Sequence, residues 1–195
     1  MKLRVLVLVA ALVTAALPSA AEAPHWSLEE GSLVGFIAMQ SGAPVKGIFE
    51  SFEAEIVFQE DALDQSRVAV TIDIASVNSE NKERDDAIRA SGLFDVAKWP
   101  TARFEAQGFT HKGGKDYEAA GKLTLRDVTR DVVLPFTLEI VPHPDNPDAR
   151  LASAKGELPV LRLDYGVGQG LWSDTSIVGD EVVIFIDIKA VWPKG

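Results

Sequence analysis

Few side chains in this sequence of 195 residues could do chemistry, and none stands in a spacing that catalysis requires. The absence of cysteine excludes disulfides, zinc–thiolate sites, iron–sulfur clusters and a thiol nucleophile. The three histidines, His25, His111 and His143, lie far apart in the chain and in no metal-ligand motif. No GxSxG segment offers a serine nucleophile on a strained turn. We therefore expect no metal site and no catalytic triad.

Acidic and glycine-rich segments supply the remaining candidates. Asp85 and Asp86, with Glu83, could act as paired carboxylates in acid–base catalysis, or could form a charged helix face. The glycines of residues 166–170 resemble a phosphate-binding loop, but the helix that a dinucleotide fingerprint requires after them is not predicted. Residues 145–148 lack the glycine and the closing glutamate of a calcium loop. We expect a protein that is not an enzyme and needs no cofactor, with catalysis by Asp85 or Asp86 as the alternative.

The chain begins in the way that a secretory signal peptide begins. Two positive charges in residues 1–4 precede an apolar run at residues 5–17, and small residues before Ala21 fit a cleavage site. As a helix this run would span about 20 Å, short of the roughly 30 Å core of a bilayer. We therefore predict a signal peptide over residues 1–21, cleaved after Ala21 or alternatively after Ala23, and export to the periplasm.

Residues 22–195 have the composition of one globular domain, without a linker or an internal repeat. The whole chain is 47% hydrophobic and carries a net charge of −10. Loss of Lys2 and Arg4 with the signal peptide would remove two positive charges, which makes the charge of the mature chain −12. A protein this acidic repels a phosphate backbone, so we expect no binding to nucleic acid.

Apolar and polar residues alternate with a period of two from residue 26 to the end of the chain. This alternation predicts about eight antiparallel strands, each with one face on a core. So many half-apolar strands must close into a barrel or fold into a sandwich. The predicted core stripes are Phe52, Ala54, Ile56 and Phe58; Val68, Val70, Ile72 and Ile74; Ala102, Phe104 and Ala106; Gly121, Leu123 and Leu125; Val132, Leu134, Phe136, Leu138 and Ile140; and Ile184, Ile186 and Ile188.

The predicted inner faces combine large and small side chains. Phenylalanines alternate with the small residues Ala38, Ala54, Ala106, Ala120, Ala154 and Gly156. An eight-stranded barrel can be filled by its side chains or can hold one small ligand. The pattern does not distinguish a packed interior from a hollow one, and both remain open at this point.

One segment, residues 79–91, lacks the strand pattern and predicts a helix. Ser79 is a plausible N-cap, and acid-first pairs Glu80–Arg84 and Asp85–Arg89 stand four residues apart. The segment has little apolar content, so we expect a solvated surface helix outside the core.

Several segments, taken in order, resemble one family. Each is weak alone, but the ordered set covers residues 25–192 and is similar to the YceI-like family of bacterial periplasmic proteins. The segments are Trp26, Ser32–Phe36, Gly47–Phe49, Phe52, Val70–Val77, Arg84–Asp85, Leu93–Asp95, Trp99–Phe104, Gly121–Leu125 with Val128–Thr129, Leu161–Gly168 and Gly179–Val182.

This resemblance implies an all-β fold: an extended, eight-stranded antiparallel lipocalin-like barrel with one short surface helix, and no catalytic site. It also implies a domain over residues 22–195 whose apolar interior binds a polyisoprenoid or an isoprenoid quinone. We expect the polar head group to meet Arg126 or Arg162 at the mouth, although salt bridges at strand edges are the alternative role for these arginines. The residues that we expect to line the interior are Phe36, Phe52, Ile72, Ile74, Phe104, Leu123, Phe136, Ile184 and Ile186.

Two departures from the family pattern bear on the turns and the partners. Asp127 stands where the family usually has glycine, so that turn is expected to be altered. Residues 38–45 are similar to a subgroup found beside, or fused to, membrane b-type cytochromes. Together with Trp99 and Trp172, which we expect to be exposed, this supports an alternative function as a non-carrier subunit that docks on such a cytochrome. We expect a monomer or a homodimer.

Overall fold

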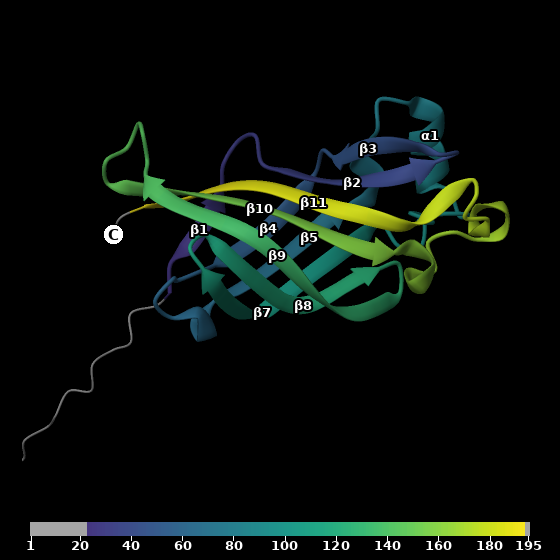
Figure 1. Ribbon diagram of the computed structural model, residues 1–195. Coiled ribbons are helices and arrows are strands. Elements are labelled where there is room, and N and C mark those ends of the chain that lie inside the picture. The colour runs from purple at the N-terminus through teal and green to yellow at the C-terminus, as the bar shows by residue number, and fades with distance from the viewer. Residues whose placement is uncertain (1–22, 194–195) are drawn as a thin grey trace, which may run out of the picture.

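The structure, a computed structural model, describes residues 23–193, and within them the chain forms an elongated antiparallel barrel with a single α-helix (Figure 1). The predicted signal peptide lies outside the described residues. No helix in the described part is long and apolar enough to cross a bilayer. The elements are β1 (His25–Leu28), β2 (Leu33–Gln40), β3 (Ala43–Phe49), β4 (Phe52–Val57), β5 (Arg67–Asp73), β6 (Val77–Asn78), α1 (Lys82–Arg89), β7 (Thr101–Gly113), β8 (Asp116–Leu125), β9 (Val128–Pro142), β10 (Ala149–Leu161) and β11 (Val178–Pro193), with short 3₁₀ turns at Leu63–Gln65, Ile74–Ser76, Arg162–Tyr165 and Gly170–Ser173.

Eight strands close the barrel in the order β1-β4-β5-β7-β8-β9-β10-β11, and β11 pairs back to β1. One edge of β11 pairs with β10, from Glu181 to Pro193. Its other edge pairs with β2 between Val178 and Asp187, and then with β1 at Ala190 and Val191. The strands β2, β3 and β6 extend the same sheet beyond β11. The predicted closed eight-stranded antiparallel barrel is confirmed.

Two tight turns use left-handed backbone conformations. Ser41 and Gly42 join β2 to β3 with φ angles of 49° and 81°, as a two-residue hairpin loop with positive φ at both positions requires. Between β8 and β9, Arg126 adopts a φ of 55° and Asp127 does not share it. The turn at Arg126 and Asp127 is thus a two-residue turn in which the arginine takes the left-handed conformation.

A bulge in β7 changes which residues face the interior. Ala106 pairs with Gly121 and Gly108 with Ala120, so one extra residue is inserted between them. As a result, Phe109 points inward, although it lies three residues after the inward-facing Ala106. The expectation that Ala120 faces inward is wrong. Side chains of a strand alternate, so Ala119 shares the inner face with Leu123 and is buried, whereas Ala120 is exposed.

The helix is shorter and more buried than the sequence predicts. It spans Lys82–Arg89, and its N-cap is Asn81, whose side chain accepts from the backbone N–H of Arg84, rather than Ser79. It lies at one end of the barrel beside β3 (Figure 1). Ile88 is 8% exposed and faces the barrel interior, so the expectation of a helix outside the core is wrong.

The two adjacent carboxylates of the helix point to different environments. Asp85 is buried and accepts hydrogen bonds from the backbone N–H of Ser79 at 3.0 Å and from its hydroxyl at 2.5 Å. Asp86 is half-exposed and pairs with Lys82 and Arg89. The predicted pairs Glu80–Arg84 and Asp85–Arg89 do not form: Arg84 donates to the hydroxyl and carbonyl of Ser79, and Arg89 pairs with Asp86. Because Asp85 and Asp86 face apart, they do not form the paired carboxylates of an acid–base site.

The contrast between these neighbours gives a first prediction. Asp85→Ala removes a buried acceptor and leaves the Ser79 donors without a partner, at a cost of about 1–3 kcal/mol. For a chain of this size, we expect the melting temperature to fall by about 2–4 °C for each kcal/mol. Asp86→Ala is the matched control, because exposed ion pairs contribute about 0–1 kcal/mol. Thermal unfolding followed by circular dichroism distinguishes the two variants, and equal destabilisation would contradict the buried role of Asp85.

Candidate ligand-binding site

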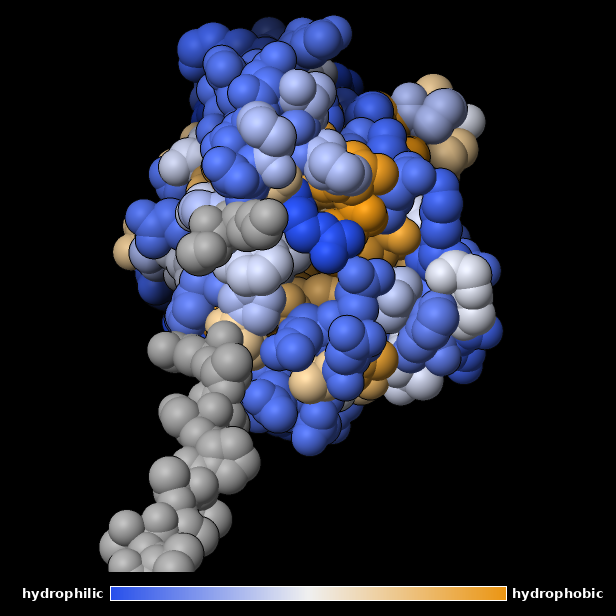
Figure 2. Space-filling view, turned by 90° about the vertical axis from the view of Figure 1, so that its left-hand side faces the viewer, coloured by the Kyte–Doolittle hydropathy of each residue, from blue (hydrophilic) through white to orange (hydrophobic). Residues whose placement is uncertain are grey.

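The inward side chains of the barrel enclose a cavity of about 260 Å³ whose surface is entirely apolar. Its lining runs from Trp26 and Phe58, near β1, to Ile88 and Leu93, beside α1. These two groups lie toward opposite ends of the barrel (Figure 1), so the cavity follows its long axis. Seen from the end at which β1 lies, apolar side chains form a recess between hydrophilic ones (Figure 2).

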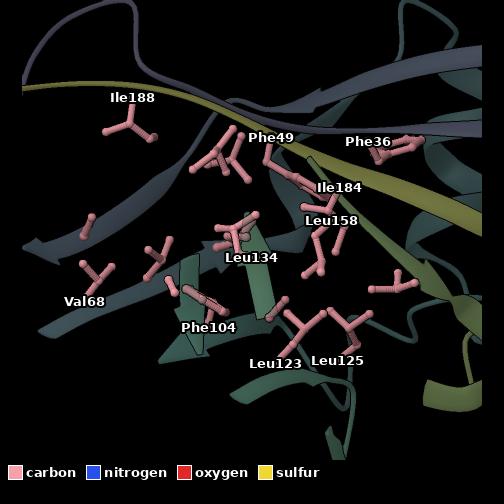
Figure 3. Close-up of a pocket in the computed structure, with 18 of the residues that line it drawn as sticks. Phe36, Phe49, Val68, Phe104, Leu123, Leu125, Leu134, Leu158, Ile184 and Ile188 are labelled. Carbon is pink, nitrogen blue, oxygen red and sulfur yellow. The ribbon is translucent and has the colours of Figure 1, made fainter. Parts of the chain in front are cut away.

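The middle of the barrel is hollow rather than filled. Phe36, Phe104 and Ile184 point into the interior (Figure 3), yet they are half-buried instead of buried. A side chain inside a closed sheet keeps accessible surface only where it borders a space. Small inward residues leave that space, because they cannot reach the opposite wall. Those that line the cavity include Ala38, Ala54, Ala102, Ala119 and Ala154.

Aromatic rings surround the cavity at the β1 end. Phe58 meets Phe109 edge-on, with ring centroids 5.5 Å apart, and Phe109 meets Phe136 in the same way at 6.4 Å. The indole N–H of Trp26 donates to the carbonyl of Phe58 at 3.0 Å, which satisfies this buried donor. Tyr117 stacks behind Phe136. The rings therefore form a packed boundary at this end, in which the buried indole N–H has an acceptor.

Arg162 forms part of the boundary at the α1 end. It is 3% exposed, and it donates from Nε, Nη1 and Nη2 to the carbonyls of Gly179, Val167 and Val178. The pairing of β11 with β2 is interrupted between Val178 and Val182, which leaves carbonyls there for the guanidinium to bond. Burial lowers the pKa of Arg162, and the charge of Asp180 acts in the opposite direction.

Arg126, like Arg162, donates hydrogen bonds to main-chain carbonyls. Its guanidinium lies 4.3 Å from the ring centre of Trp99 and donates to the carbonyls of Leu93 and Gly166. Within residues 23–193, neither Arg126 nor Arg162 forms an ion pair with a carboxylate. The alternative expectation, that these arginines form salt bridges at strand edges, is therefore wrong. Contact with a ligand head group stays a prediction for both.

The structure brings together most of the predicted lining. Eight residues of the predicted set line the cavity, whereas Phe52 packs against the same core without lining it. The eight are Phe36, Ile72, Ile74, Phe104, Leu123, Phe136, Ile184 and Ile186. Ile88 also lines the cavity, although the sequence predicts a solvated helix over residues 79–91. Leu93, just beyond that predicted helix, lines the cavity as well. The available signal was that Ile88 is the one large apolar side chain of the predicted helix.

The tryptophans expected to form an exposed docking patch are both half-buried. Trp172 packs over Gly92, where a Cβ would come within 2.5 Å of the indole ring. Trp99 lies under Arg126.

The glycine loop that contains Gly166 and Gly168 is followed by a 3₁₀ turn instead of a helix, so it does not form a dinucleotide fingerprint. Across residues 23–193, no group of three His, Cys, Asp or Glu side chains could hold a metal ion.

Known proteins of this fold are similar along most of the chain. A protein of Azotobacter vinelandii, named UPF0312 protein, is 33% identical over 145 residues, which are 74% of this chain and 73% of that protein. Protein YceI of Escherichia coli is 28% identical over 149 residues, 76% of this chain and 74% of that protein. The crystal structure of Burkholderia cenocepacia BcnA matches with a TM-score of 0.74 and 30% identity, covering 85% of this chain and 99% of BcnA.

A more distant likeness concerns the fold alone. A polyisoprenoid binding domain from Saccharophagus degradans has a TM-score of 0.65 at 15% identity, covering 89% of this chain and 100% of that domain.

The sequence pattern of the YceI-like domain family matches residues 26–190, from β1 to the end of the cavity lining on β11. The chain belongs to the family of YceI-like domains.

Proposed function

We propose that this protein is a periplasmic carrier that holds an isoprenoid lipid or isoprenoid quinone in its barrel. The observation that carries the proposal is the hollow, wholly apolar cavity along the barrel axis. The structurally similar domain of Saccharophagus degradans is named for polyisoprenoid binding, which supports this choice of ligand. Export to the periplasm rests on the signal peptide predicted at residues 1–21.

The shape of the cavity favours a long and slender chain. Along β11, lining residues recur from Val182 to Ala190, and strands rise about 3.3 Å per residue, so the lined stretch is about 25 Å long. A linear chain of several isoprene units fits such a space better than a compact molecule does. Each buried CH₂ group contributes about 0.8 kcal/mol, so the tail supplies most of the binding energy.

A carrier accounts for the polar residues better than an enzyme does. Asp85 is held by Ser79, and Asp86 is paired with Lys82 and Arg89, so neither carboxylate faces the cavity. The cavity surface itself presents no polar atom for acid–base or nucleophilic chemistry. The function that such a cavity can perform is to remove a hydrocarbon chain from water.

The proposal predicts a lipid in the protein as it is made. Protein purified from the periplasm without detergent and extracted with organic solvent should release an isoprenoid at about one molecule per chain, identified by mass spectrometry. The same extraction applied to an unrelated periplasmic protein is the control for adventitious lipid. Repeated extracts without a stoichiometric isoprenoid, together with failure of the lipid-free protein to take up geranylgeraniol, would contradict the carrier function.

A second prediction concerns the filling of the cavity. Ile184→Trp adds bulk to the hollow interior, so bound isoprenoid should fall at least tenfold while the free energy of unfolding changes by less than about 1 kcal/mol. In a packed interior the same change would cost about 1–3 kcal/mol through overpacking. Val141→Trp is the matched control, because Val141 is 38% exposed on the barrel surface and should retain lipid. Bound lipid and melting temperature are measured on the same samples. A stable Ile184→Trp variant that still holds lipid would contradict the assignment of the cavity.

A further inference from the structure

The hydrogen-bonded wall of the barrel is interrupted where β9 and β10 separate. The two strands pair from Arg150 with Pro142 as far as Gly156 with Phe136, and their pairing ends there. Beyond this point β10 continues to pair with β11 as far as Leu161, and β9 pairs with β8 back to Val128. Residues 157–161 and 128–135 therefore face each other without a ladder between them.

The local sequence explains the separation. Pro135 and Pro159 stand on the two facing strands, and neither has a backbone N–H to donate to a ladder. At the point of separation the chains approach closely: a Cβ on Gly156 would lie 2.6 Å from the carbonyl oxygen of Pro135 and 3.2 Å from Cδ1 of Leu134. Leu134 thus occupies the angle at which the strands diverge.

A polar surface cleft of about 540 Å³ lies along this gap. Residues of both strands, of the following 3₁₀ turn and of β8 line it, among them Lys122, Thr129, Arg130, Asp164 and Tyr165. Val160 lines the cleft and also the apolar cavity. Since Leu134 and Leu158 line the cavity from the same two strands, side chains alone separate the cleft from the interior here. Side chains change rotamer far more readily than a strand ladder opens.

We propose that this cleft between β9 and β10 is the head-group site of the bound isoprenoid, whose tail passes between Leu134 and Leu158 into the cavity. The proposal rests on the proposed carrier function. The cavity surface is entirely apolar, so a polar head buried within it would lose its hydrogen bonds to water without compensation. The cleft adjoins the cavity and supplies polar side chains, so head and tail can both be accommodated.

The charges of the cleft favour an uncharged head group. Lys122 pairs with Asp131 at 2.7 Å, and Arg130 pairs with Asp164 at 3.7 Å, so the cations of the cleft are balanced by acids. Burial raises the pKa of Tyr165, which keeps its phenol neutral. The whole chain is acidic as well. A hydroxyl or carbonyl oxygen suits this site better than a phosphate, which would add negative charge beside two carboxylates.

Arg130 is the donor that we assign to this head group. Its Nε donates to the backbone carbonyl of Asp164 at 3.0 Å, and its guanidinium lies 5.8 Å from the ring centre of Tyr165. The 3.7 Å between Nη2 and the Asp164 carboxylate exceeds hydrogen-bond length, so the outer nitrogens can turn to a ligand oxygen. Arg162 differs, since its Nε, Nη1 and Nη2 already donate to main-chain carbonyls. Nη1 of Arg126 likewise donates to two main-chain carbonyls.

Photolabelling locates the head group directly. The probe is a geranylgeraniol analogue that carries a diazirine beside its hydroxyl, bound to lipid-free protein and irradiated. Peptide mass spectrometry should find the label in residues 128–135 and 157–165. Label confined to residues around Trp26 and Phe58, or around Ile88 and Leu93, would overturn the head-group site while leaving the carrier function intact. A probe that does not bind at all would overturn the carrier function and this inference with it.

A pair of variants tests the role of Arg130. Arg130→Met should weaken the binding of geranylgeraniol about tenfold, as loss of a hydrogen bond from a charged donor does. It should leave the affinity for the hydrocarbon analogue without the hydroxyl within about twofold. Arg103→Met is the matched control, because Arg103 is similarly exposed and pairs with Glu105 on the outside of β7. Equal effects of Arg130→Met on both ligands, or no effect on either, would contradict the assignment.

Discussion

The closure of the sheet through β11 is the interaction on which the rest of the structure depends. This strand pairs with β10 on one edge and with β2 and then β1 on the other, which closes eight strands into a barrel. Closure also fixes the alternation of side chains, so that Ile184, Ile186 and Ile188 all point inward. The apolar cavity follows because several of the inward side chains, such as Ala38, Ala54 and Ala154, are too small to fill the interior.

The boundaries of the cavity are made by two different kinds of chemistry. Near β1, aromatic rings pack edge to face, and the buried indole of Trp26 has its own acceptor. Beside α1, the buried cation Arg162 would be costly in an apolar setting, but carbonyls at the irregularity of β11 accept its hydrogen bonds. The indole of Trp26 and the guanidinium of Arg162 thus have their partners within the protein. The interior therefore offers a ligand hydrocarbon contacts, and any polar head group must find its partners at the barrel wall.

The period-two alternation was enough to predict the antiparallel strands and most of the cavity lining, because side-chain direction in a strand follows from position alone. It left a barrel and a sandwich open, and the family resemblance favoured the barrel. The alternation could not place Phe109, since a bulge in β7 is not visible in the pattern. The burial of Asp85 and Ile88 depends on how α1 docks against the barrel end, which is a tertiary contact. The gap between β9 and β10 has a local signal in Pro135 and Pro159, but the point at which the two strands separate depends on their register.

The proposed carrier function requires that the interior of the barrel be hollow. Diffraction from crystals of the lipid-free protein under xenon pressure measures this directly, because apolar cavities that exclude water take up xenon. We predict anomalous density from xenon inside the barrel, in contact with Ile184, Leu134 and Phe104. Density for tightly packed side chains across the barrel, with no xenon inside it, would contradict the hollow interior and the carrier function that depends on it.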